Sequence, residues 1–234
     1  MSDFLEVEDL SLSDLRIIFE DSGSIKKSRS MRSKGALDPV LSLNNRVIAL
    51  LFAKPSTRTR FSFEVGINQM GGKAISVSEN EMQLANGEKI SDTAQVLSQY
   101  VDLIVLRTNR HGDLLELAKN SEIPVINGLT DFNHPCQIMA DIFTVLEHRG
   151  NLDNLKVSYV GDGNNIVHSW LMLAQKIPFH FSIACPEGFE PDQTLVDKVN
   201  QSGISSVEIV HDPFKSVKDS DVVYTDVWAS MGQK

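Results

Sequence analysis

The sequence predicts an α/β protein built from two doubly wound parallel-sheet domains. Short apolar, β-branched runs recur along the chain and alternate with amphipathic stretches, which is the pattern of repeated βα units. Because most of these runs are apolar on both faces, we expect strands that helices cover from both sides. A chain of 234 residues is long enough to bury two such cores without disulfides.

The apolar runs are the expected strands. They span residues 47–52, 74–77, 103–106 and 125–126 in the first part of the chain, and 157–160, 179–184, 207–210 and 222–225 in the second. Amphipathic helices are expected between them. The clearest are those over residues 58–70, 92–100, 138–148 and 167–176.

A polar segment at residues 149–154 follows the expected helix 138–148 and suits a domain boundary. We therefore expect a first domain over residues 1–148 and a second over residues 149–234. The sequence ends shortly after the strand 222–225, with no crossover helix beyond it. That strand is expected either to lie at a sheet edge or to belong to a second domain that is incomplete at its C-terminus.

Charge and cysteine content narrow the classes of partner. Lys and Arg total 22 against 31 Asp and Glu, a net charge of −9, which argues against binding nucleic acid or an acidic membrane surface. Any anion must be held by a local cluster. The cysteines, Cys136 and Cys185, exclude a disulfide scaffold or a zinc-finger metal site and suit a reducing compartment.

The first fourteen residues are acidic, with no basic residue, unlike secretory or organellar leaders. The longest apolar run, residues 47–53, is too short to span a bilayer. We therefore expect a cytoplasmic protein without a membrane partner.

The strongest chemical motif is the segment Lys54–Arg60, with the sequence Lys-Pro-Ser-Thr-Arg-Thr-Arg, between an expected strand and an expected helix. A helix N-terminus presents free N–H groups and the positive end of the helix dipole. Three hydroxyl and two guanidinium groups share this turn, and phosphate prefers such a donor set. One hydroxyl would suffice for an ordinary helix cap, so we interpret the turn as a phosphate site. It contains no glycine and is not a Walker loop.

A second motif, His134–Gln137 (His-Pro-Cys-Gln), also joins an expected strand to a helix and so lies on the same carboxyl edge. Pro135 suits the first turn of a helix. His134 can donate a hydrogen bond to a carbonyl oxygen that develops negative charge; a histidine packed at a helix start is the alternative. Cys136 has no acid or second base beside it, so we interpret it as a packing residue.

Arg107 ends the expected strand 103–106 at this same edge. Because the two motifs above also lie at this edge, we interpret Arg107 as a cation of the site rather than as a surface charge. The polar loop 78–86 is long enough to be a mobile lid, and Gln83 within it is uninformative by itself.

The segment Gly161–Asn165 (Gly-Asp-Gly-Asn-Asn) follows the expected strand 157–160. It is only a partial dinucleotide fingerprint, because Ile166 stands where the third glycine would be, and a nicotinamide dehydrogenase is therefore disfavoured. The amides of Asn164 and Asn165 offer groups for an amino-acid substrate. An Asx turn that begins a helix is the alternative.

Asp226 follows the last expected strand, where a carboxylate can pair with a substrate ammonium. The Ser-Met-Gly sequence at 230–232 has the character of a flexible closing loop.

Together, the segments Ser-Thr-Arg-Thr-Arg, His-Pro-Cys-Gln, Gly-Asp-Gly-Asn-Asn and Asp-Val-Trp-Ala-Ser-Met-Gly resemble those of the aspartate/ornithine carbamoyltransferase family. The resemblance covers essentially the whole chain, and the last two segments are closer to the ornithine branch. It implies transfer of the carbamoyl group from carbamoyl phosphate to the δ-amine of L-ornithine, giving L-citrulline and phosphate, without cofactor or metal. It also implies a homotrimer or a multiple of trimers.

The resemblance further implies a set of substrate contacts. Those to carbamoyl phosphate would be Ser56, Thr57, Arg58, Thr59, Gln83, Arg107, His134, Pro135, Cys136 and Gln137, with Arg58, Arg107 and His134 as catalytic residues. Those to ornithine would be Asn165, Asp226, Ser230 and Met231. Gln83 would lie on the loop that family members lend to a neighbouring subunit.

The sequence departs from the family pattern at two points. Ala53 stands where many members have an acidic residue. The sequence also lacks the His-Cys-Leu-Pro segment and final helix that complete the site in the family, so we expect a truncated second domain. Two alternatives stay open: aspartate as the second substrate, and a binding module that holds carbamoyl phosphate without turnover.

Overall fold

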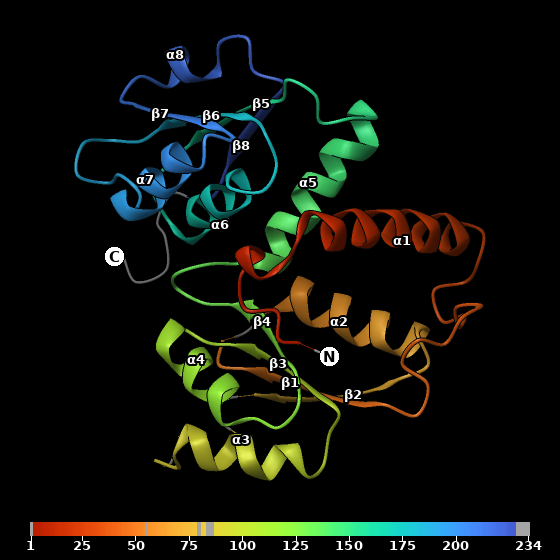
Figure 1. The fold of residues 1–234 in the computed structure, drawn as a ribbon. Helices are drawn as coiled ribbons and strands as arrows, with labels where there is room; N and C mark the ends of the chain where they lie inside the picture. Colours follow the sequence, from red (N-terminus) through yellow and green to blue (C-terminus); the bar gives the residue numbers. More distant parts are fainter. Residues whose placement is uncertain (1, 55, 79–80, 83–86, 228–234) are drawn as a thin grey trace. The chain divides into compact units, whose positions relative to one another are not determined.

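The structure, a computed structural model, describes residues 2–54, 56–78, 81–82 and 87–227 (Figure 1). The chain divides into two compact units. Unit 1 contains residues 1–5 and 13–130, and unit 2 contains residues 6–12 and 131–234. Each unit has a four-stranded parallel sheet with helices on its faces, which confirms the predicted fold class.

The sheet of unit 1 has the strand order β2-β1-β3-β4. Its strands are β1 (Val47–Phe52), β2 (Lys73–Ser78), β3 (Leu103–Arg107) and β4 (Val125–Leu129). Phe52 is in register with Ser78 on one side and with Arg107 on the other. Strands β2, β1 and β3 therefore end together, and the segments that follow them leave from one edge of the sheet.

The α-helices described in this part of the chain are α1 (Leu12–Ser30), α2 (Thr57–Gln69), α3 (Ile90–Ser98) and α4 (His111–Asn120). Helix α2 covers one face of the sheet, and α3 and α4 cover the other (Figure 1). The alternation along β1 explains this, because Leu50 packs in a cluster with Ile67 of α2 while Leu51 packs with Leu114 of α4. The expectation of strands buried on both faces is confirmed.

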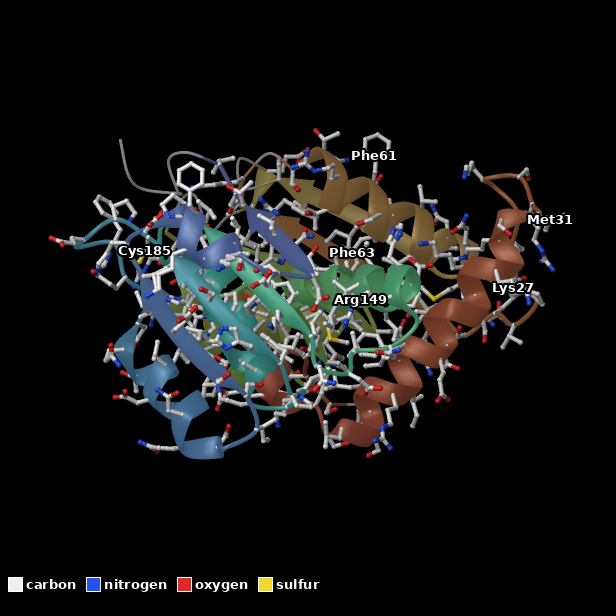
Figure 2. The ribbon with its side chains drawn as sticks, turned by 90° about the horizontal axis from the view of Figure 1, so that it is seen from above. Lys27, Met31, Phe61, Phe63, Arg149 and Cys185 are labelled. Carbon is white, nitrogen blue, oxygen red and sulfur yellow. The ribbon has the colours of Figure 1, made fainter. Side chains whose placement is uncertain are left out.

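Hydrogen bonds hold the N-terminal segment of unit 1 and the loop that follows α1. Phe4 bridges to Ile126 of β4 in parallel. Near the end of α1, Arg29 donates from Nε and Nη2 to the carboxylate of Asp38 in the loop that follows, at 2.8 and 2.5 Å. Figure 2 shows Met31, which is 90% exposed, at the C-terminal end of α1.

The sheet of unit 2 has the strand order β7-β6-β5-β8. Its strands are β5 (Lys156–Val160), β6 (His180–Ala184), β7 (Ser206–Val210) and β8 (Val222–Thr225). The helical elements are η1 (Val7–Asp9), α5 (Pro135–Arg149), α6 (Asn165–Ala174), α7 (Gln193–Ser202) and α8 (Pro213–Val217). Strand β8 lies at the edge of the sheet, which was one of the two expectations for it.

Helices α6 and α7 cover one face of this sheet and α8 covers the other (Figure 1). Trp170 of α6 is fully buried, with ring contacts to Phe179, Phe181 and Tyr224 at centroid distances of 5.7 to 6.0 Å. This aromatic cluster joins α6 to β6 and β8.

Within the described residues, no helix combines the length and the apolar character that crossing a membrane requires.

Candidate active site

The N-terminus of α2 has no side-chain cap. Ser56 occupies the N-cap position with an extended backbone, but its side chain makes no capping hydrogen bond. The first-turn N–H groups of a helix have no partner within the helix. Here the Ser56 hydroxyl does not satisfy them either, so the simple capping role that was the alternative for this segment is absent. Arg58 on the first turn is exposed, and Thr59 is half-buried.

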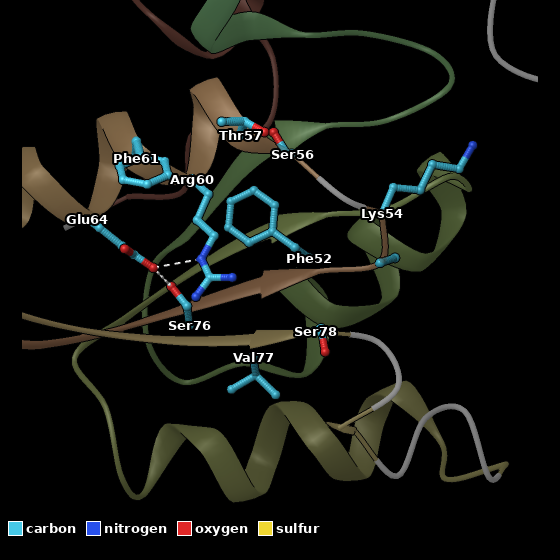
Figure 3. A pocket seen from close by; sticks show the side chains of 11 residues that line it. Phe52, Lys54, Ser56, Thr57, Arg60, Phe61, Glu64, Ser76, Val77 and Ser78 are labelled. Carbon is cyan, nitrogen blue, oxygen red and sulfur yellow. Dashed lines mark hydrogen bonds and ion pairs between the residues drawn. The ribbon is translucent and has the colours of Figure 1, made fainter.

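A pocket of about 620 Å³ opens beside this helix end (Figure 3). It is lined by Lys54, Ser56 and Thr57 of the predicted motif, together with residues of α2 and β2. Arg60 also lines the pocket, but its Nε donates to Glu64 at 2.8 Å. Because Arg60 is ion-paired, its charge is largely compensated.

Arg107, at the end of β3, reaches the same turn. Its Nη1 donates to Thr59 Oγ1 at 3.2 Å, and its Nε is buried without a hydrogen-bond partner among the described residues. The pKa of Arg107 is lowered, first by burial and then by the charge of Arg58. No described carboxylate forms an ion pair with Arg107. A half-buried cation beside a second cation is costly unless an anion joins them.

The second predicted motif begins α5. His134 is the buried N-cap residue, and Pro135 occupies the first turn as predicted. The backbone N–H of His134 donates to Ser169 Oγ at 2.8 Å, and that hydroxyl donates to the carbonyl of Asn165 at 2.7 Å. Ser169 therefore connects a residue predicted for carbamoyl phosphate with one predicted for ornithine. Nothing in the sequence pattern singled it out.

Burial raises the pKa of the Cys136 thiol to about 12. The thiolate is the nucleophilic form of cysteine, and at this pKa it is scarce at neutral pH. The environment therefore agrees with the interpretation of Cys136 as a packing residue.

Gln137, on the first turns of α5, donates from Nε2 to Asp141 Oδ1 at 2.9 Å. Near the end of β8, Asp226 accepts a hydrogen bond from Asn164 Nδ2 at 3.2 Å. These two pairs place carboxylate and amide groups at the ends of elements within unit 2. Asp141 was not predicted, although its position four residues after Gln137 on a helix is a signal that could have found it.

The Gly161–Asn165 segment has a structural explanation. Asn164 is the N-cap of α6, and its side chain accepts from the backbone N–H groups of Ile166 and Val167. A Cβ at Gly163 would lie 2.2 Å from the backbone nitrogen of Pro191. This glycine is therefore required for packing against the chain itself, and the Asx turn that was the alternative is present at Asn164.

The predicted site residues thus form two described groups. Ser56, Thr57, Arg58, Thr59 and Arg107 belong to unit 1, whereas His134, Pro135, Cys136, Gln137, Asn165 and Asp226 belong to unit 2. Each group is described within its own unit. Gln83, Ser230 and Met231 lie outside the described residues. Among the residues that the structure describes, no group of three or more His, Cys, Asp or Glu is arranged to hold a metal ion.

Two sequence models match the chain in succession. The model of the aspartate/ornithine carbamoyltransferase carbamoyl-P binding domain matches residues 2–147, and that of the Asp/Orn binding domain matches residues 153–234. The chain therefore belongs to the aspartate/ornithine carbamoyltransferase family.

Its similar relatives include members named for ornithine. It is 45% identical over 233 residues to the ornithine carbamoyltransferase of Syntrophus aciditrophicus, an alignment covering 99% of this chain and 75% of that protein. It is 57% identical over 189 residues to the chloroplastic enzyme of Pisum sativum, covering 81% of this chain and 50% of that protein.

Solved structures agree with this assignment. The ornithine carbamoyltransferase of Pyrococcus furiosus superposes with a TM-score of 0.90 at 43% identity, over 100% of this chain and 74% of that one. The anabolic enzyme of Campylobacter jejuni gives a TM-score of 0.90 at 35% identity, over 100% of this chain and 76% of that one. The chain thus spans from 50% to 76% of the length of these relatives.

Proposed function

We propose that this chain transfers the carbamoyl group of carbamoyl phosphate to the δ-amine of L-ornithine, giving L-citrulline and phosphate. The single observation that supports it most is the pair of guanidinium groups at the α2 N-terminus. Arg107 is half-buried beside Arg58, and the described residues offer it no carboxylate. The names of the relatives, ornithine carbamoyltransferases throughout, support the choice of substrates.

In this proposal the phosphate is held by Arg58, Ser56 and the first-turn N–H groups of α2. Hydrogen bonds to a charged group contribute about 1.5–3 kcal/mol each, so several of them can bind a phosphate dianion and stabilise it as the leaving group. The uncapped Ser56 side chain supports this role.

The carbamoyl oxygen gains negative charge as the amine attacks. We assign Thr59, Arg107 and His134 to stabilise that charge, and one such donor can be worth about 10²–10³ in rate. The contact between Arg107 and Thr59 supports their acting together. The attack is direct, with no covalent enzyme intermediate and no cofactor, and holding both substrates in reacting geometry supplies the proximity contribution.

The remaining predicted contacts complete the two substrate sets. Gln83, Pro135, Cys136 and Gln137 are assigned to carbamoyl phosphate, and Asn165, Asp226, Ser230 and Met231 are assigned to ornithine. The exposed Asp226 carboxylate has the charge that an ornithine ammonium requires.

The assembly and setting are also proposals. We propose a homotrimer or a multiple of trimers on the strength of the family resemblance, and a sedimentation mass of three times the chain mass, or a multiple of it, tests this. A cytoplasmic setting is consistent with the thiol state of Cys136 and Cys185. The role in arginine biosynthesis is proposed from the family alone.

The decisive experiment compares citrulline formation by the native chain and by Arg58→Ala. We expect the variant to lose at least about a hundredfold in turnover, because a phosphate-binding guanidinium is removed. Arg110→Ala is the matched control, since Arg110 is an 80% exposed arginine close to the same sheet edge, and it should retain activity.

The outcome separates the alternatives. Product from aspartate rather than ornithine would reassign the second substrate. Binding of carbamoyl phosphate without citrulline would indicate a binding module. Near-normal citrulline formation by Arg58→Ala, with both variants folded, would refute the phosphate assignment.

A further inference from the structure

Asp141 and Gln137 form a side-chain pair on α5. The two side chains lie one helical turn apart on α5, and Gln137 Nε2 donates to Asp141 Oδ1 at 2.9 Å. An ionised carboxylate only accepts hydrogen bonds, whereas an amide has a donating and an accepting end. Only the amide nitrogen can therefore face Asp141. The amide oxygen, Oε1, is left to accept a hydrogen bond elsewhere.

The pair is more than a helix-stabilising surface contact. Oδ2 of Asp141 is buried and makes no hydrogen bond of ordinary geometry among the described residues, although the Tyr224 hydroxyl lies near the carboxyl group. Burial and the nearby Asp226 raise the pKa of this carboxyl group, while the hydrogen bond from Gln137 and the Tyr224 hydroxyl lower it. Pairs at this helical spacing stabilise exposed helices only slightly, which does not offset the cost of burying a carboxylate. A buried and incompletely satisfied group in such surroundings is more typical of a functional site.

We propose that Asp141 is a positioning residue that presents the Gln137 amide oxygen to the –NH₂ group of carbamoyl phosphate, and thereby selects this substrate over acyl phosphates. The inference rests on the proposed function, in which Gln137 contacts carbamoyl phosphate. Acetyl phosphate is the informative comparison, because it carries a methyl group where carbamoyl phosphate carries –NH₂. The methyl group offers no hydrogen to an accepting oxygen, which is then left unpaired.

The test compares the dissociation constants of carbamoyl phosphate and acetyl phosphate, measured by titration calorimetry. In the native protein we expect carbamoyl phosphate to bind at least about tenfold more tightly, from the cost of an unpaired polar group. Asp141→Asn replaces the carboxylate with an amide of the same shape that donates or accepts, so the Gln137 amide can turn over. We expect the preference to fall toward one, with the thermal unfolding midpoint unchanged.

Two further variants isolate the role of the pair. Gln137→Met removes the amide at similar volume and should also abolish the preference; Asp141→Asn added to it should then cause no further loss. Glu147→Gln is the matched control, because Glu147 is an exposed acid on the same helix, and it should keep the native preference. In turnover, Asp141→Asn should raise KM for carbamoyl phosphate more than it lowers kcat.

Several results would overturn the proposal. The first is that the native protein binds carbamoyl phosphate and acetyl phosphate with equal affinity. The second is that Asp141→Asn keeps the native preference for carbamoyl phosphate. The third is that Asp141→Asn causes an additional loss of affinity for carbamoyl phosphate in the Gln137→Met background. Should Asp141→Asn not fold, retention of the preference by Gln137→Met would be decisive against it. Failure of the proposed function would look different. In that case the native protein would form no citrulline from ornithine and would not bind carbamoyl phosphate.

Discussion

Surroundings decide what chemically similar residues can do. Arg60 and Arg107 lie close to the α2 N-terminus, but Arg60 is paired with Glu64, whereas Arg107 is half-buried next to Arg58 without a described carboxylate. An arginine whose charge is compensated contributes little attraction for an anion. The uncompensated pair is therefore the better candidate for binding phosphate.

At the same scale, both thiols should be unreactive in the folded protein. Burial raises the pKa of Cys136 to about 12 and that of Cys185 to about 11. Alkylation requires the thiolate, and the cysteines of the urea-unfolded chain have an ordinary pKa near 8.5. We therefore expect iodoacetamide at pH 8 to modify the native protein at least about a hundredfold more slowly than the unfolded chain. Mass spectrometry over time measures both rates. Rapid labelling of native Cys136 would contradict its burial and reopen the question of a nucleophile.

At the scale of elements, helix N-termini have different uses in this protein. Asn164 caps α6 and Asp192 caps α7 with side-chain hydrogen bonds, whereas Ser56 leaves the N-terminus of α2 uncapped. A side-chain cap satisfies donors that would otherwise seek water or a ligand. The N-termini of α3, α4 and α5 also carry no side-chain cap. What favours an anion at α2 is therefore the open helix end together with the cations Arg58 and Arg107 beside it.

The caps of α6 and α7 allow a matched comparison. Asn164→Ala and Asp192→Ala should each lower the free energy of unfolding by about 1 kcal/mol, the usual cost of losing a cap. Asn164 also donates to Asp226, so Asn164→Ala alone should raise KM for ornithine. Urea titration and citrulline kinetics measure the two effects. An equal change in KM for both variants would show that it follows from general destabilisation.

At the scale of the whole molecule, stability should depend on one partly buried histidine, His168, in mildly acidic solution. His168 Nδ1 donates to the carbonyl of Phe132 at 2.9 Å, and its Nε2 accepts from the N–H of Asp192 at 3.2 Å. A carbonyl only accepts and a backbone N–H only donates, which fixes the neutral tautomer. Burial lowers the pKa of His168 in the folded protein.

The direction of the pH effect follows from that lowered pKa. The unfolded chain, with an ordinary histidine pKa of about 6.5, binds the proton more readily than the folded one. His168 therefore contributes stability that is complete above about pH 6.5 and is lost as pH falls through the folded pKa. Carboxylates with a lowered pKa, such as Asp38 and Glu64, lose their contribution to stability only below the ordinary pKa values of 3.8 and 4.5.

Urea titrations at several pH values between 8 and 5 test this prediction. We expect the free energy of unfolding of the native protein to fall below pH 6.5. His168→Gln should be less stable at pH 7.5 and should change less over the same range. Parallel pH dependence of the two proteins would exclude His168 as the responsible group.

Much of this protein can be predicted from local sequence. The alternation of apolar runs and amphipathic stretches determines the βα units, because strands buried on both faces require apolar side chains on both faces. The run Val47–Phe52 became β1 with the predicted bounds, and helix 138–148 was correct in type but begins earlier, at Pro135. Motifs at strand ends also indicated phosphate chemistry, because donor type and helix position are local properties.

Only the tertiary structure decided which side chains meet. The sheet order places the ends of β1 and β3 side by side, so that Arg107 contacts Thr59, 48 residues earlier in sequence. The roles of Ser169 and Asp141 depend on which groups are buried next to them, and no local pattern specifies that. Hydrogen bonds and pKa shifts arise from distances and burial between remote segments, whereas the βα pattern arises from the sequence alone.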